Sequence, residues 1–85
     1  MIDVKQAVEA AVKYFTDLYA GKHYDLALEE VELNSDETFW LITLGFDTEQ
    51  KASYTLPMVS AKRKYKIFKV DSKTGKVWSM KIREI

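Results

Sequence analysis

Cysteine is absent from the 85-residue sequence, which also has one histidine, one proline and three glycines. A domain this small in an oxidising compartment usually needs disulfides, so their absence favours the cytoplasm. A zinc site takes three or four ligands, mostly His and Cys, which this composition cannot supply. No apolar run approaches the ~20 residues of a transmembrane helix, and the N-terminus lacks the features of a signal peptide. We therefore expect a cytoplasmic chain with no zinc and no membrane partner.

Residues 1–85 are enough for a single domain, and an apolar fraction of 47% is sufficient for its core. The net charge is zero, but the charges are segregated along the chain. Residues 1–50 hold eleven acids and three lysines, whereas residues 51–85 hold ten bases and two acids. Either the two halves fold against each other and their charges compensate, or the basic half presents a face to an acidic partner.

The first segment predicts an amphipathic helix over residues 4–20. Asp3 and Gln6 have the spacing of a capping box, and apolar residues recur at helical spacing after them. Gly21 suits the left-handed position that ends a helix. His23, just beyond it, is better placed to interact with the negative end of the helix than to act in catalysis.

The remainder predicts four antiparallel strands at about residues 24–33, 38–47, 62–71 and 76–84. The turn before the last strand contains Gly75, which supplies the positive φ of a tight hairpin. The fold class is therefore α+β, with one N-terminal helix packed on a curved four-stranded antiparallel meander sheet.

Three irregularities are expected within these strands. The alternation of apolar residues slips by one position at Glu29-Glu30 and again between Ile67 and Phe68. Such a slip usually marks a β-bulge, which bends the sheet. Gly45, inside the second strand, indicates a bulge or a close approach to the backbone.

Carboxylates are densest in the first strand and the turn after it, at Glu29, Glu30, Glu32, Asp36 and Glu37. Converging carboxylates bind divalent cations or act as acids and bases. In a regular strand, however, Glu30 and Glu32 share one face and Glu29 points to the other. Charges that keep an edge strand from pairing with another sheet explain the group better. No glycine-rich phosphate loop or GxSxG turn occurs, so we assign no catalytic, cofactor-binding or metal-binding residue and expect neither an enzyme nor a small-molecule substrate.

A run of bases in the third strand is the alternative binding site. It comprises Lys62, Arg63, Lys64, Lys66 and Lys69, with aromatic residues among them. Bases and stacking aromatics on one sheet are typical of proteins that bind single-stranded nucleic acid. The neutral overall charge argues against this function, so nucleic acid is the alternative partner rather than the first.

The second strand predicts apolar side chains on both faces of the sheet. Phe39 and Leu41 lie on one face, and Trp40, Ile42, Leu44 and Phe46 lie on the other. One helix covers only one face. Either the long segment 48–61 folds over the second face, or that face binds a protein partner, a homodimer included. The residues that we assign to partner binding are Trp40, Ile42, Tyr54, Leu56, Met58 and Val59. The expected function is that of a non-catalytic protein-binding or regulatory module.

Residues 65–77 read Tyr-Lys-Ile-Phe-Lys-Val-Asp-Ser-Lys-Thr-Gly-Lys-Val and follow a helix rich in Ala and Val. This order, with its Asp-x-x-Thr-Gly turn between two strands, resembles the PepSY family, and the wider architecture is similar to cystatin-like folds. The resemblance implies a non-catalytic module, in some PepSY proteins associated with restraint of a peptidase. The chain departs from that family in its long segment 48–61 and in showing no export signal. It also lacks the Gln-x-Val-x-Gly motif with which cystatins inhibit thiol proteases.

Overall fold

The helix begins at Asp3, whose side chain caps it. The Asp3 carboxylate accepts a hydrogen bond from the Gln6 backbone N–H at 2.8 Å, and the Gln6 side chain accepts one from the Asp3 N–H at 2.9 Å. This is the predicted capping box, and it satisfies two backbone donors that the first helical turn would leave free. Gly21, the predicted end signal, lies outside the described residues. In the structure the helix ends earlier, with the Tyr19 N–H bonded to the Phe15 carbonyl.

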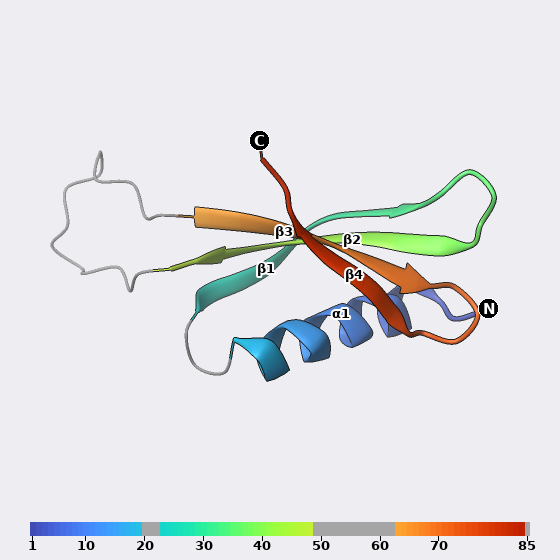
Figure 1. Ribbon diagram of the computed structural model, residues 1–85, viewed down its shortest axis with the longest axis horizontal. Coiled ribbons are helices and arrows are strands. Elements are labelled where there is room, and N and C mark those ends of the chain that lie inside the picture. Colours follow the sequence, from blue (N-terminus) through green and yellow to red (C-terminus); the bar gives the residue numbers. More distant parts are fainter. Residues whose placement is uncertain (20–22, 49–62, 85) are drawn as a thin grey trace, which may run out of the picture.

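The computed structural model describes residues 1–19, 23–48 and 63–84. They form one helix and four strands, namely α1 (Val4–Leu18), β1 (Tyr24–Leu33), β2 (Phe39–Asp47), β3 (Arg63–Asp71) and β4 (Val77–Ile82). The strands pair with their sequence neighbours in the order β1-β2-β3-β4, all antiparallel, and α1 lies across one face of the twisted sheet (Figure 1). The predicted α+β class is confirmed, and the predicted ends of the elements differ by one or two residues.

The core lies between α1 and the face of the sheet that it covers. Ala7, Ala11 and Phe15 are the fully buried residues of α1. The Phe15 ring contacts Phe46 of β2 at a centroid distance of 4.7 Å and Phe68 of β3 at 6.3 Å. The two alanines have side chains small enough for a close approach of helix and sheet, and Phe15 supplies the large side chain of the helix to the core. The other core residues on the same face of the sheet are Ile42, Leu44 and Val70.

A β-bulge in β1 decides where its acidic side chains lie. Leu28 pairs with Leu44 and Glu30 with Thr43, so Glu29 is an extra residue with no partner position on β2. This confirms the slip predicted at Glu29-Glu30. Because the extra residue absorbs one alternation, Glu29 lies on the same face as Glu30, away from α1. The prediction that Glu29 points to the opposite face is therefore wrong.

The slip predicted between Ile67 and Phe68 is wrong. The register between β2 and β3 is continuous, with Ile67 paired to Thr43 and Phe68 to Ile42. Both residues are apolar because both faces of the sheet carry apolar side chains at this point. A different irregularity occurs in β4, where Val77 pairs with Val70 and Ser79 with Lys69, which leaves Trp78 as the extra residue.

The hairpin turn between β3 and β4 forms as predicted. Gly75 has a φ of 79° and its N–H is bonded to the Asp71 carbonyl. The Asp71 side chain accepts hydrogen bonds from the backbone N–H groups of Thr74 and Lys73, and these bonds lower the pKa of the exposed carboxyl. Asp71 therefore stabilises the turn as an anion.

A matched pair of substitutions tests whether Ile42 is a residue of the core. Ile42 is fully buried under α1, whereas Ile82 is 70% exposed. We expect Ile42→Ala to lower the free energy of unfolding by ~2–5 kcal/mol, since it leaves a cavity in the core, and Ile82→Ala by less than ~1 kcal/mol. Urea denaturation followed by circular dichroism measures both. Equal losses for the two variants would contradict the assignment of the core.

Candidate functional site

The face of the sheet opposite α1 is the candidate site, and we call it the open face. Its residues alternate along each strand with those that pack under the helix, and none of the described helices and strands packs against it. It consists of Glu29, Glu30 and Glu32 from β1, Phe39, Leu41, Thr43, Gly45 and Asp47 from β2, Arg63, Tyr65, Ile67, Lys69 and Asp71 from β3, Trp78, Ser79 and Lys81 from β4, and Arg83 beyond it.

Apolar side chains occupy the middle of the open face and one of its ends. Leu41 and Ile67 lie on the adjacent strands β2 and β3 and are both partly exposed. At the end near the β3–β4 turn, the Phe39 ring meets Trp78 edge-on at a centroid distance of 6.4 Å. Trp78 is 57% exposed, and its indole N–H donates to the Asp71 carboxylate. A large aromatic ring with its polar atom already bonded is suited to a protein contact.

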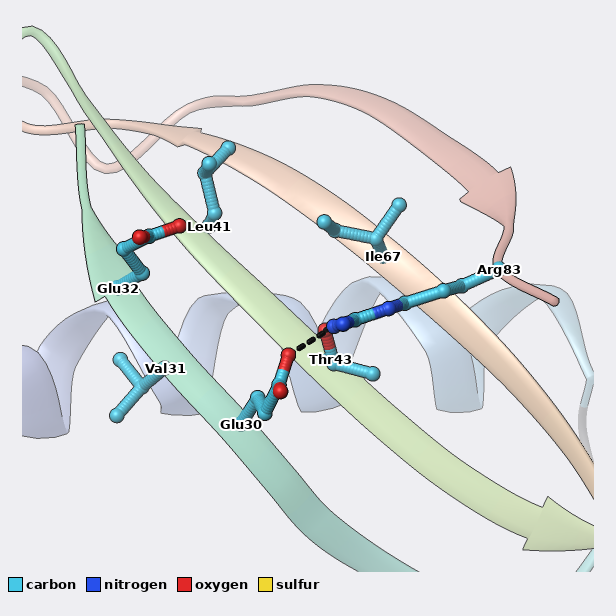
Figure 2. Close-up of a pocket in the computed structure, with 7 residues that line it drawn as sticks. All are labelled: Glu30, Val31, Glu32, Leu41, Thr43, Ile67 and Arg83. Carbon is cyan, nitrogen blue, oxygen red and sulfur yellow. Dashed lines mark hydrogen bonds and ion pairs between the residues drawn. The ribbon is translucent and has the colours of Figure 1, made fainter. Parts of the chain in front are cut away.

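A shallow groove of about 430 Å³ crosses the open face between β1 and the end of the chain (Figure 2). Leu41, Thr43 and Ile67 lie along it, with Glu30 and Glu32 on the β1 side and Val31 at its edge. From the opposite side Arg83 reaches across the sheet, pairs with Glu30, and donates to the Thr43 hydroxyl at 2.9 Å. The groove therefore has Leu41 and Ile67 on its floor, two acids on one side and an arginine on the other.

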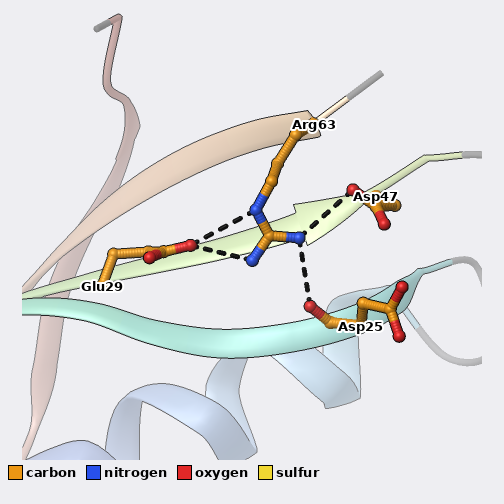
Figure 3. Close-up of polar contacts among 4 residues, drawn as sticks. All are labelled: Asp25, Glu29, Asp47 and Arg63. Atoms are coloured by element: carbon orange, nitrogen blue, oxygen red, sulfur yellow. Dashed lines mark hydrogen bonds and ion pairs between the residues drawn. The ribbon is translucent and has the colours of Figure 1, made fainter. Parts of the chain in front are cut away.

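A second arginine joins three strands at the other end of the open face (Figure 3). Arg63 of β3 donates to the Glu29 carboxylate at 2.8 Å, to the Asp47 carboxylate at 3.2 Å and to the Asp25 carbonyl at 3.2 Å. The hydrogen bond to Glu29 is the main cause that raises the pKa of Arg63, and Asp47 contributes to it. Since the Asp47 side chain is only 3% exposed, Arg63 supplies the charge partner that a buried carboxylate requires.

Gly45 makes room for this cluster. A Cβ atom at position 45 would collide with the Glu29 carboxylate and approach the Arg63 guanidinium. The close approach predicted at Gly45 is therefore confirmed, with the side chain of the β1 bulge as the approaching group. The bulge and the glycine lie side by side, because Ala27 pairs with Gly45 just before the extra residue.

The two described residues among those predicted to bind a partner, Trp40 and Ile42, lie on the face that α1 covers. Ile42 is fully buried under α1, and Trp40 is partly buried on the same face, with its indole N–H donating to the Ile2 carbonyl at 3.2 Å. The prediction that the row from Trp40 to Ile42 forms a binding surface is wrong, because this row is the one that α1 covers. The remaining predicted contacts, Tyr54, Leu56, Met58 and Val59, lie outside the described residues.

The basic residues predicted as a nucleic-acid patch do not share one face. Arg63 and Lys69 lie on the open face, whereas Lys64 and Lys66 alternate with them and lie on the helix side. Arg63 is held by carboxylates, and the Lys69 ammonium lies 4.2 Å from the centroid of the Phe39 ring. Lys62 lies outside the described residues. The arrangement does not give the continuous basic track that a nucleic-acid backbone follows.

No reactive cluster forms among the residues that the structure describes. No three His, Asp or Glu side chains in this part of the chain converge as metal ligands would. The His23 ring packs edge-on against Phe15 at a centroid distance of 4.9 Å, and its Nδ1 atom has no hydrogen-bond partner there. Glu29 and Glu30, the central acids of the β1 cluster, each pair with an arginine. None of the described helices is long and apolar enough to cross a membrane.

The chain has no match among family models, curated proteins or solved structures. The site is therefore defined by the geometry of this chain alone.

The sequence predicts correctly that β2 has apolar side chains on both faces, but the face predicted to be open is the one that α1 covers. Leu41, Ile67, Trp78 and Arg83 were not assigned to the site. One pattern in the sequence does indicate which face is open. The row that contains Leu41 continues through Thr43 and Gly45 to Asp47, whereas the other row stays apolar to Phe46. A row that becomes polar is the one that one helix leaves uncovered.

Removal of the Arg63 charge tests its structural role. We expect Arg63→Met to lower the free energy of unfolding by ~2–3 kcal/mol, because it leaves the Asp47 carboxylate buried without a partner. The expected loss of stability is smaller than that for a fully buried ion pair, since the Arg63 side chain is 27% exposed. Asp47→Asn in the Arg63→Met background should restore part of the loss. Urea denaturation of the wild type, the two single variants and the double variant measures the coupling free energy between Arg63 and Asp47. Strictly additive losses would show that the ion pair contributes nothing to stability.

Proposed function

We propose that the chain is a non-catalytic protein-binding or regulatory module that engages its partner through the open face. The observation that carries the proposal is the uncovered apolar surface formed by Leu41, Ile67 and Trp78, with 57% of Trp78 exposed. Apolar side chains gathered on one face of a small domain are typical of contact sites. The residues of β2 under α1 already form the hydrophobic core, so the apolar side chains of the open face are not needed for it.

The polar side chains of the open face support binding by contact. Arg63 and Arg83 are held by hydrogen bonds to groups on neighbouring strands. Side chains that are ordered before association lose less conformational entropy when a partner arrives. The groove lined by Leu41, Ile67 and the Glu30–Arg83 pair offers both apolar and charged groups, which suits a partner with its own mixture of the two.

The non-catalytic part of the proposal rests on the composition. The sequence offers no cysteine nucleophile and one histidine, and the described carboxylates Glu29 and Glu30 are engaged by arginines. The resemblance of residues 65–77 to PepSY proteins is in keeping with a regulatory role. We place this role in the cytoplasm, because a small domain without cysteine suits a reducing compartment.

Charge insertion on the open face tests the proposal. Wild-type protein immobilised as bait is compared with Ile67→Glu and Leu41→Arg, which place a charge on the apolar floor, and with Val4→Glu, which adds one at an exposed apolar position of α1. We expect the wild type and Val4→Glu to retain the same partner from native lysate, and the two open-face variants to lose at least ~90% of it. Thermal unfolding first establishes that each bait is folded. A partner retained equally by all four baits, or no retention by the wild type together with no self-association up to ~1 mM, would overturn the proposal.

A further inference from the structure

The open face changes its charge from one edge to the other. One transverse row of residues runs through the register as Glu30, Thr43, Ile67 and Lys81, from β1 to β4. The next row begins with Glu32 and continues through Leu41 to Lys69 and Ser79. The β1 edge is thus acidic, the β4 edge carries Lys81, and Leu41 and Ile67 lie between them, beside the Arg83 side chain that reaches across to Glu30.

Such a face is complementary to itself under one of two possible rotations. A two-fold axis that runs parallel to the strands, between β2 and β3, lays the β4 edge of a second copy over the β1 edge of the first. Glu30 then faces Lys81 of the other copy, and the position of Thr43, where the Arg83 guanidinium lies, faces Ile67, each contact occurring twice, as closed dimers require. An axis across the strands would instead place acidic edge on acidic edge, which is repulsive.

We propose that the partner of the open face is a second copy of this chain, stacked face to face about the axis parallel to the strands. The inference rests on the proposed function, because it names the partner of the same surface. Two antiparallel sheets stack in this way at ~10 Å with their strands at ~30° to each other.

The charged side chains are available for the contact. The Glu30 side chain is 59% exposed even though Arg83 bonds its Oε1 atom, so its second oxygen is left for a lysine of the other copy. Lys81 is exposed and makes no ion pair with the described part of its own chain. Two copies would therefore gain two ion pairs at the rim around Leu41 and Ile67.

The size of the face limits the strength of the dimer. Four strands spaced ~4.8 Å apart and ~25 Å long present roughly 500 Å² per copy, or about 1,000 Å² in total. This area is at the lower limit of specific interfaces. We therefore expect a reversible dimer with a dissociation constant in the micromolar range or weaker, in equilibrium with the monomer.

Sedimentation equilibrium of charge-reversed variants tests the pairing. Lys81→Glu alone and Glu30→Lys alone each place like charges opposite each other twice, so each should dimerise at least ~10-fold more weakly than the wild type. An equimolar mixture of the two variants restores opposite charges at both contacts and should form a heterodimer. The double variant Glu30→Lys/Lys81→Glu should dimerise with itself. Lys5→Glu, on the exposed side of α1, is the matched control and should leave association unchanged.

Two results would overturn the inference. One is a wild type that stays monomeric up to ~1 mM, and the other is a dimer that charge reversal does not weaken or that the mixture does not restore. Circular dichroism establishes that both variants are folded, and Lys81→Glu removes no described ion pair within the monomer. The bait experiment separates the two proposals. If Ile67→Glu abolishes capture of a different protein while the wild type is monomeric, the self-pairing is wrong and the proposed function stands.

Discussion

The packing of Phe15 against the row Ile42, Leu44 and Phe46 is the interaction on which the rest of the structure depends. A single helix can cover only one face of a four-stranded sheet, and this row decides which face that is. Once it is buried, the alternation of β-strands sends the other residues of β2 and β3 outward. The open face, its groove and its arginine pairs all follow from that choice.

The open face then has to accommodate charges close to the backbone. The β1 bulge brings Glu29 onto the same side as Glu30, and Gly45 leaves the space that the Glu29 carboxylate occupies. Arg63 and Arg83 neutralise these acids from β3 and from the end of the chain. The segregation of charge along the sequence is resolved in this way, since acids from the first half pair with bases from the second across neighbouring strands. The apolar side chains Leu41, Ile67 and Trp78 lie on the same face, and the proposed function rests on them.

Local signals in the sequence were sufficient for the elements of the fold. The capping box of Asp3 and Gln6, the positive φ of Gly75 and the slip at Glu29-Glu30 each depend on residues close in the chain, and each prediction is confirmed. The face of the sheet that is open could not be predicted in the same way. Apolar residues alternate on both sides of β2, and a slip was read between Ile67 and Phe68 where both faces simply carry apolar side chains. The arginine pairs were missed because their partners are distant in sequence and meet only through the register of the sheet.

The two tryptophans give the most direct test that one face is covered and the other open. Trp40 lies on the helix side, where its indole N–H is bonded to the Ile2 carbonyl, and Trp78 lies on the open face. Acrylamide quenching of Trp78→Phe reports Trp40 alone, and that of Trp40→Phe reports Trp78 alone, both at a concentration low enough for monomer. We expect a Stern–Volmer constant for Trp78 several times larger than for Trp40, with emission at longer wavelength. Equal quenching, or a Trp40 that is the more accessible, would contradict the account.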